Sequence, residues 1–177
     1  MNSRRHDLEA DSWAFALAIY ARPGVSEACL TLQNEAGVDV MLLLMATFAA
    51  VRNRVLLTAD EIKALDEACR PWREQIVWRL RAVRTELKTG LRSAPSRETE
   101  PFRSKIKALE LEAEKLENQL LAASLPLRPS GQAIVTAEQL RAVLENVVAL
   151  FAERRGVKPN LSASIGTIVE AALKDAS

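Results

Sequence analysis

The chain has 177 residues and a formal net charge of +1, with 49% apolar, 27% charged and 5% aromatic residues. This near-neutral charge excludes a whole-protein field that would draw the chain to nucleic acid or anionic lipid, so such attraction would need a local patch. The length suits one domain that folds without a metal or disulfide, and the two cysteines, Cys29 and Cys69, are too few for a disulfide framework. Because the N-terminal residues also lack the apolar stretch of a signal peptide, we expect a cytoplasmic protein with reduced thiols.

The first expected helix spans residues 13–20, where Trp13, Leu17 and Tyr20 share one apolar face. Ser12 stands immediately before it and is of a type that caps helix N-termini.

Two further helices are expected over residues 26–35 and 39–53. Gly37 is placed to cap the end of the earlier one, and Asp39 begins the later one, where a carboxylate is favourable. The third helix is apolar almost all round, which is typical of a central buried element. Its most apolar run, residues 38–51, is shorter than the roughly 20 residues that cross a bilayer, so no membrane span is expected.

Two long apolar stripes predict an antiparallel helical hairpin. The first stripe recurs at helical spacing and comprises Trp72, Ile76, Leu80, Val83, Leu87 and Leu91. The second has the four-and-three spacing of a coiled-coil seam and comprises Phe102, Ile106, Leu109, Ala113, Leu116 and Leu120. The polar stretch 89–101 between them contains glycine and prolines and predicts a loop.

Capping boxes at Thr58–Glu61 and Thr136–Gln139 predict the starts of two more helices. The helix after Thr136 has a broad apolar face and should pack into the main core. We therefore expect an all-α protein, a single helical bundle over residues 8–156, followed by a C-terminal tail at 157–177 that contains a short amphipathic helix.

Residues suited to catalysis are scarce. The lone histidine, His6, lies near the N-terminus, and the chain contains no Cys-x-x-Cys pair, phosphate-binding loop, nucleophile elbow or zinc-protease signature. The acidic residues Glu110, Glu112, Glu114 and Glu117 lack the histidines of a di-iron bundle, so a solvated or salt-bridged face is favoured. We expect no catalytic residue, no metal site and no cofactor, and therefore no enzyme.

A basic stretch lies in the first half of the predicted hairpin and comprises Arg70, Arg73, Arg79, Arg81, Arg84, Lys88 and Arg92. On a helical wheel Arg73 and Arg84 flank the apolar stripe, whereas Arg81 lies on the opposite side. One interpretation is a nucleic-acid surface. The favoured one is that the flanking arginines pair with Glu110, Glu114 or Glu117 while the rest are solvated.

Trp78 falls nearly opposite the first apolar stripe. It packs beneath another helix or is exposed, and these alternatives stay open. If it is exposed, a candidate interface consists of Trp78, Arg81, Lys88 and Arg92, because tryptophan and arginine are enriched in binding hot spots.

A polar set lies among apolar neighbours near the N-terminus and comprises Trp13, Tyr20, Gln33 and Asp39. Buried polar groups need partners, so the favoured interpretation is an internal hydrogen-bond network or helix capping. The alternative is the polar rim of a binding pocket.

The pattern W-x-F-A-L-x-x-Y-x-x-P-G-V-x-x-A-C-L-x-L-Q, at residues 13–33, resembles a family of short helical bacterial proteins. That family is defined only as a domain of unknown function and is common in proteobacteria. The similarity extends to about Gly156, and residues 158–177 have no counterpart. The resemblance implies a cytoplasmic helical protein but brings no activity, cofactor or catalytic residue with it.

The expected function is macromolecular binding, as an adaptor or regulator with a protein partner. One alternative is a nucleic-acid or ribosome-associated protein that uses the basic helix 71–92. Another is a small-molecule binder that uses the first three helices, and a homo-oligomer also remains open.

Overall fold

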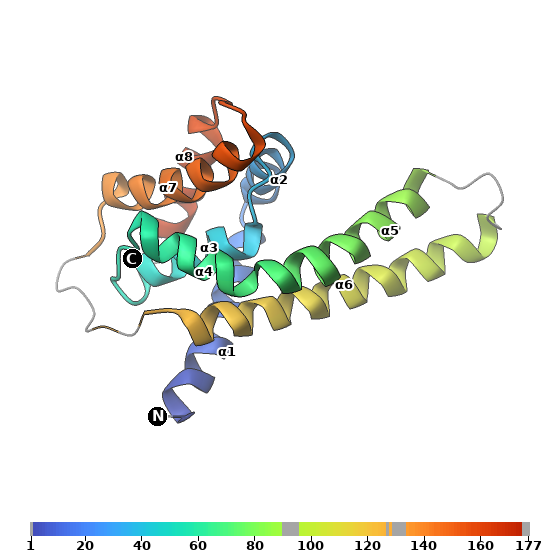
Figure 1. The fold of residues 1–177 in the computed structure, drawn as a ribbon, viewed down its shortest axis with the longest axis horizontal. Helices are drawn as coiled ribbons and strands as arrows, with labels where there is room; N and C mark the ends of the chain where they lie inside the picture. The colour runs from blue at the N-terminus through green and yellow to red at the C-terminus, as the bar shows by residue number, and fades with distance from the viewer. Residues whose placement is uncertain (1, 90–95, 127, 129–133, 175–177) are drawn as a thin grey trace.

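The computed structural model describes residues 2–89, 96–126, 128 and 134–174, and every regular element within these ranges is a helix (Figure 1). The expected all-α class is therefore confirmed. In chain order the elements are α1 (Asn2–Tyr20), α2 (Val25–Ala36), α3 (Val40–Val51), α4 (Ala59–Trp72), the π-helix η1 (Arg73–Val77), α5 (Trp78–Thr89), α6 (Ser96–Ser124), α7 (Ala137–Arg155) and α8 (Ser162–Lys174).

Helix α3 is the centre of the core, as its composition predicts. Every residue from Met41 to Ala50 is buried, and α1, α6 and α7 pack around the helix. Gly37 ends α2 in the left-handed conformation (φ 74°), which a glycine adopts without steric cost. Asp39 then caps α3, since its carboxylate accepts a hydrogen bond from the Leu42 amide at 2.9 Å.

Helix α1 begins at Asn2, well before the expected start at residue 13. Ser12 therefore lies inside the helix, where its hydroxyl donates to the Glu9 carbonyl at 3.1 Å instead of capping a first turn. The buried side chains of α1 include Phe15 and Ile19. Trp13 packs against the core, whereas Leu17 and Tyr20 of the same face are exposed.

Both predicted capping boxes are confirmed. At the start of α4, the Thr58 hydroxyl accepts from the Glu61 amide at 3.3 Å while the Glu61 carboxylate accepts from the Thr58 amide at 2.9 Å. The same reciprocal pair joins Thr136 and Gln139 at the start of α7. These two motifs satisfy amides that a helix leaves unpaired in its first turn.

Helices α5 and α6 form the expected antiparallel hairpin, which extends away from the rest of the molecule as an arm (Figure 1). The predicted loop at 89–101 is too long, because α5 runs to Thr89 and α6 already begins at Ser96, with Pro101 inside the helix. The intervening residues 90–95 lie outside the described part of the chain.

The buried faces of the hairpin differ from the predicted apolar stripes. Arg73 and Val77 are buried on one helix and Glu110 and Glu117 on the other, whereas Leu109 is 48% exposed. A physical reason is the π-helix, whose wider turns rotate the residues after it relative to an α-helical wheel. The second reason is that charged side chains of the two helices pair with one another inside the hairpin.

Residues after 156 contribute to the same core as the rest of the chain. Helix α8 packs against α2 and α7, and Ile165, Ile168 and Val169 are buried within the main hydrophobic cluster. The expected amphipathic helix is therefore present, but it is part of the bundle and not a separate tail. Among the described residues, no helix combines the length and apolar character needed to cross a membrane.

Both cysteines should be unreactive in the folded protein. Cys29 and Cys69 are free thiols with 1% and 0% of their surface exposed. Burial raises the pKa of Cys29 to about 12, so the reactive thiolate is scarce at neutral pH. We expect a thiol reagent such as Ellman's reagent at pH 8 to label neither cysteine until denaturant is added. Rapid labelling of the native protein would contradict this burial.

Candidate functional site

A cleft of about 590 Å³ opens where the arm joins the body of the molecule. Its apolar walls come from α1, α2, α3, η1, α5 and α6, and they comprise Trp13, Ala16, Leu17, Tyr20, Leu30, Val40, Met41, Leu44, Val77, Trp78, Ala108 and Leu111. Several of these large side chains remain well exposed, including Leu17 (48%), Leu30 (47%) and Leu111 (48%). The volume lies within the roughly 300–1,000 Å³ typical of ligand pockets.

The polar residues of the cleft connect to a buried network centred on Arg73, which is 1% exposed. Its guanidinium donates to Asp39 at 2.6 Å and to Asp66 at 2.5 Å. The other oxygen of Asp66 forms an ion pair with Arg154 of α7, also at 2.5 Å. The network thereby ties α4 and η1 to the start of α3 and to α7.

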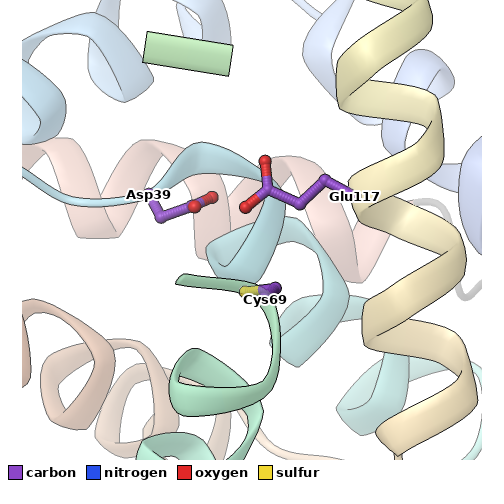
Figure 2. A group of neighbouring side chains, drawn as sticks. All are labelled: Asp39, Cys69 and Glu117. Atoms are coloured by element: carbon purple, nitrogen blue, oxygen red, sulfur yellow. The ribbon is translucent and has the colours of Figure 1, made fainter. Parts of the chain in front are cut away.

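Glu117 of α6 lies beside Asp39, and the two carboxyl groups face each other (Figure 2). Burial, the charge of Asp39 and a hydrogen bond with it raise the pKa of Glu117 to about 10. Burial alone would raise the pKa of Asp39 too, but the charge of Arg73 and hydrogen bonds from Glu117 and the Leu42 amide lower it below its ordinary value. At neutral pH Glu117 is therefore a neutral acid that donates to an ionised Asp39.

This protonation gives the network a balanced charge. With Glu117 neutral, the carboxylates of Asp39 and Asp66 match the guanidinium groups of Arg73 and Arg154. Buried charges persist only when they are paired and hydrogen-bonded. The proton on Glu117 is thus part of what makes the burial of Asp39, Asp66 and Arg73 tolerable, whereas Arg154 is partly exposed.

Asp39, Cys69 and Glu117 also form the kind of donor group that could hold a metal ion, since one ligand atom of each lies within 4.8 Å of the others (Figure 2). The Arg73 Nη1 atom, however, lies 2.6 Å from Asp39, 3.7 Å from the Cys69 sulfur and 3.9 Å from Glu117. A guanidinium cation thus contacts all three donors. Because a metal ion would be repelled by it, the arrangement favours a structural ion-pair network over metal binding.

Above this network, arginines of α5 pair with glutamates of α6 along the wall of the cleft. Arg81 donates to Glu110 at 2.8 Å, to Glu114 at 2.6 Å and to the side-chain oxygen of Gln33 at 2.7 Å. Arg84 forms a second ion pair with Glu110. The favoured prediction that the flanking arginines, Arg73 and Arg84, pair with the α6 glutamates is confirmed by the Arg84–Glu110 and Arg73–Glu117 pairs. The placement of Arg81 on the opposite, solvated side is wrong.

The glutamates themselves differ from the predicted solvated face. Glu110 and Glu117 are buried and Glu114 is half-buried, while Glu112 is exposed. Burial tends to raise the pKa of Glu110, but hydrogen bonds from Arg84 and Arg81 lower it below its ordinary value. Glu114, by contrast, has a raised pKa because of its burial. The sequence left open whether this face is solvated or salt-bridged. The structure shows that its buried and half-buried glutamates form salt bridges.

The structure brings most of the predicted site residues into one place. The polar set Trp13, Tyr20, Gln33 and Asp39 lines the same cleft as Trp78 and Arg81 of the candidate interface. Of that interface, Lys88 is exposed and does not line the cleft, and Arg92 lies outside the described residues. Two predictions made from separate segments therefore converge on one surface.

Trp78 is exposed, which resolves the alternatives left open for it. Its side chain is 42% accessible, and its ring lies 5.7 Å from the guanidinium carbon of Arg73. It also lines a second cleft of about 800 Å³, together with Phe151, Arg154 and Arg155. The tryptophan thus stands where the two clefts adjoin.

Sequence reasoning missed the central residues of the network. Asp66 is 0% exposed, and its spacing from Ile62 and Cys69 places it on the apolar face of α4. A carboxylate on such a face is a usable signal of a buried ion pair. Arg73 was assigned to the flank of a stripe, and no local pattern indicates that it is completely enclosed.

Comparison with known proteins gives one match. A family described as "Protein of unknown function (DUF2390)" matches residues 11–121, which include the cleft residues of α1 to α6 and most of the buried network. No curated protein matches the chain, and no solved structure does.

Proposed function

The chain belongs to the DUF2390 family, and since that membership assigns no activity, we propose from the geometry that the protein acts by non-catalytic binding of a partner protein. An apolar segment of the partner occupies the cleft between the arm and the body. The observation that carries this proposal is the set of large apolar side chains, on α1, α2, α5 and α6, that line one concave surface and remain partly exposed.

These side chains have the composition of a binding surface. Tyr20 and Trp78 are 38% and 42% exposed, and aromatic residues beside arginine are the types enriched in interface hot spots. Apolar groups gathered in a hollow also expel water when a partner fills it, which is the main driving force for association. The protein would serve as an adaptor or regulator, as the sequence suggested.

The polar part of the cleft supports binding over catalysis. Asp39 and Glu117 share a proton, but they are 5% and 1% exposed and Asp39 is held by Arg73. A general acid must come within hydrogen-bond reach of its substrate, and these groups are engaged with each other beneath the apolar walls. Their role is to hold α3 and α6 in position so that the cleft keeps its shape.

A nucleic-acid function receives less support than the basic stretch suggested. Arg73, Arg81 and Arg84 are engaged by carboxylates, which leaves Arg70, Arg79 and Lys88 as the exposed cations described in this stretch. Phosphate contacts supply most of the affinity of such proteins, and scattered cations supply few. A small-molecule ligand is the second candidate, because the cleft volume suits one.

Replacing Trp78 with alanine should weaken partner binding by about 2 kcal/mol or more, which is typical of a hot-spot tryptophan. The melting temperature should change little, because the ring is 42% exposed. The measurement is quantitative co-purification of partners with the tagged chain, followed by titration of the recovered partner. We expect a partner protein to co-purify with the native chain and not with Trp78→Ala.

Ile134→Ala is the matched control, since Ile134 is 73% exposed and does not line the cleft. It should retain the same partner. A partner that binds both variants equally would contradict the proposal. Native mass spectrometry would favour the small-molecule ligand instead if it detected a small molecule bound to the native chain but not to Trp78→Ala, and if no protein partner were recovered.

A further inference from the structure

The walls of the cleft are faces of helices, which restricts the kind of segment that can bind there. The lining stripe on α1 comprises Trp13, Ala16, Leu17 and Tyr20. The same intervals of three, one and three residues recur among the lining residues of α6 from Ser104 to Leu111. Side chains at these intervals share one side of a helix, so the cleft is bordered by two helical ridges.

These ridges are held in place by hydrogen bonds between the elements that carry them. Asn118 of α6 donates to the Ser12 hydroxyl at 3.0 Å and to the Glu9 carbonyl at 3.1 Å, which fixes α1 against α6. Arg81 donates to the side-chain oxygen of Gln33 at 2.7 Å, which ties α5 to α2. The cleft is therefore formed before a partner arrives, and a preformed site avoids the cost of ordering its walls on binding.

The backbone of the walls has no hydrogen bonds to offer a bound segment. Every residue lining the cleft except Asp39 lies within α1, α2, α3, η1, α5 or α6, and backbone groups within a helix pair along that helix. An extended segment would leave its own amides without partners against apolar walls, and each unpaired group is costly. A helix pairs its backbone internally and presents only side chains, so it suits this cleft.

The apolar stripe of α1 has the length that a bound helix requires. From Trp13 to Tyr20 the helix rises about 10 Å, which is two turns. A helix that binds in a groove uses anchors at i, i+3, i+4 and i+7, and these extend over the same two turns. The wall on α6 continues from Ser104 to Glu117, a rise of about 20 Å, so the helix has room to extend beyond its anchors.

Lys107 gives the cleft a cation that is available to a partner. Carboxylates engage Arg73, Arg81 and Arg84 of the cleft. Lys107 is exposed, and none of the ion pairs within the described ranges of the chain involves it. It stands one turn from Leu111 on the same ridge. A carboxylate next to an apolar anchor of the partner would complement its charge.

We propose that the occupant of the cleft is an amphipathic α-helix of the partner protein, with apolar residues at i, i+3, i+4 and i+7 and an acidic residue that pairs with Lys107. This inference rests on the proposed function, since it names the class of protein segment that the cleft takes. The apolar side of the helix packs against the two ridges, and its polar side stays in water.

The probe is a phage-displayed library of random 16-residue peptides, selected on the full chain, and the selected peptides are then titrated by fluorescence anisotropy. Leu111→Glu should raise their dissociation constants by at least about tenfold, because a carboxylate enters an apolar contact. Leu109→Glu is the matched control, since both leucines are 48% exposed but Leu109 does not line the cleft, and its affinity should equal that of the native chain. Circular dichroism checks that both variants are folded.

The conformation of the bound peptide tests the helix directly. Its ¹³Cα chemical shifts should be helical in the complex, and a proline placed between the anchors should raise the dissociation constant by about 100-fold, because proline breaks a helix. Lys107→Glu should weaken binding about fivefold by setting like charges together. Exchange of the acidic residue of the peptide for lysine should then restore the affinity for this variant.

The outcomes separate this inference from the proposed function. Peptides that are lost with Leu111→Glu but bind in an extended or proline-rich form would overturn the helix and leave protein binding in the cleft intact. If no peptide is selected, or if every selected peptide binds Leu111→Glu as tightly as the native chain, the proposed function fails together with this inference. An unchanged affinity with Lys107→Glu would overturn the acidic contact.

Discussion

Replacing Arg73 with methionine should destabilise the fold by about 3–5 kcal/mol, the cost typical of breaking one side of a buried ion pair. Arg73 is 1% exposed and pairs with both Asp39 and Asp66. Without its charge, the ionised Asp39 loses its counterion in a dry environment, and Asp66 retains only Arg154. Methionine fills much of the space that arginine leaves. The loss of stability therefore results mainly from the missing charge and only to a small extent from a cavity.

The measurement is the free energy of unfolding from denaturant titration followed by circular dichroism. Arg79→Met provides the control, because Arg79 is an exposed arginine in the same basic stretch, and surface substitutions of this kind stay within about 0.5 kcal/mol. If Arg73→Met costs less than about 1 kcal/mol, the network does not hold the helices together as argued.

Replacing Glu117 with glutamine should stabilise the protein, increasingly so as the pH rises from 5 to 9. Burial and the charge of Asp39 raise the pKa of Glu117 to about 10, whereas in the unfolded chain it is near 4.3. The folded state therefore binds more protons than the unfolded state between these values, and stability falls as the pH rises through this window. Glutamine can still donate to Asp39 but has no proton to lose.

At pH 5 the variant should already be more stable than the native chain by about 1 kcal/mol, because Glu117 stays protonated in the folded state but is mostly ionised in the unfolded chain. At pH 9 the difference should reach about 2 kcal/mol or more, since each unit of pKa shift corresponds to 1.36 kcal/mol. Glu112→Gln, on the exposed side of the same helix, should show no such trend. A pH-independent difference between Glu117→Gln and the native chain would contradict the raised pKa.

The lowered pKa of Asp39 acts in the opposite direction and at lower pH. Burial alone would raise this pKa, but Arg73 and hydrogen bonds from Glu117 and Leu42 lower it. Its contribution to stability is complete above its unfolded pKa, near 3.9, and is lost as the pH falls through the folded value. The two carboxyl groups of Figure 2 therefore limit stability from opposite ends of the pH scale.

Local patterns in the sequence determined the helical class and many helix boundaries. Thr58 and Thr136 begin helices because each provides a cap that works within four residues, and Gly37 ends one because it adopts a left-handed conformation. The burial of α3 follows from its apolar composition on all sides. Such features depend on neighbours in the chain, so they can be read without knowledge of the fold.

The tertiary structure decided which face of each helix is buried. Trp13 and Trp78 could be recognised as residues of interest, but only the packing of α1, α5 and α6 brings them into one cleft. Arg73 and Glu117 lie 44 positions apart in the sequence, and their burial depends on a π-helix and on mutual charge compensation. A hydrophobic pattern in the sequence predicts only which apolar side chains are buried. A charged side chain is buried when the fold brings an oppositely charged partner to it, and that partner can lie far away in the sequence.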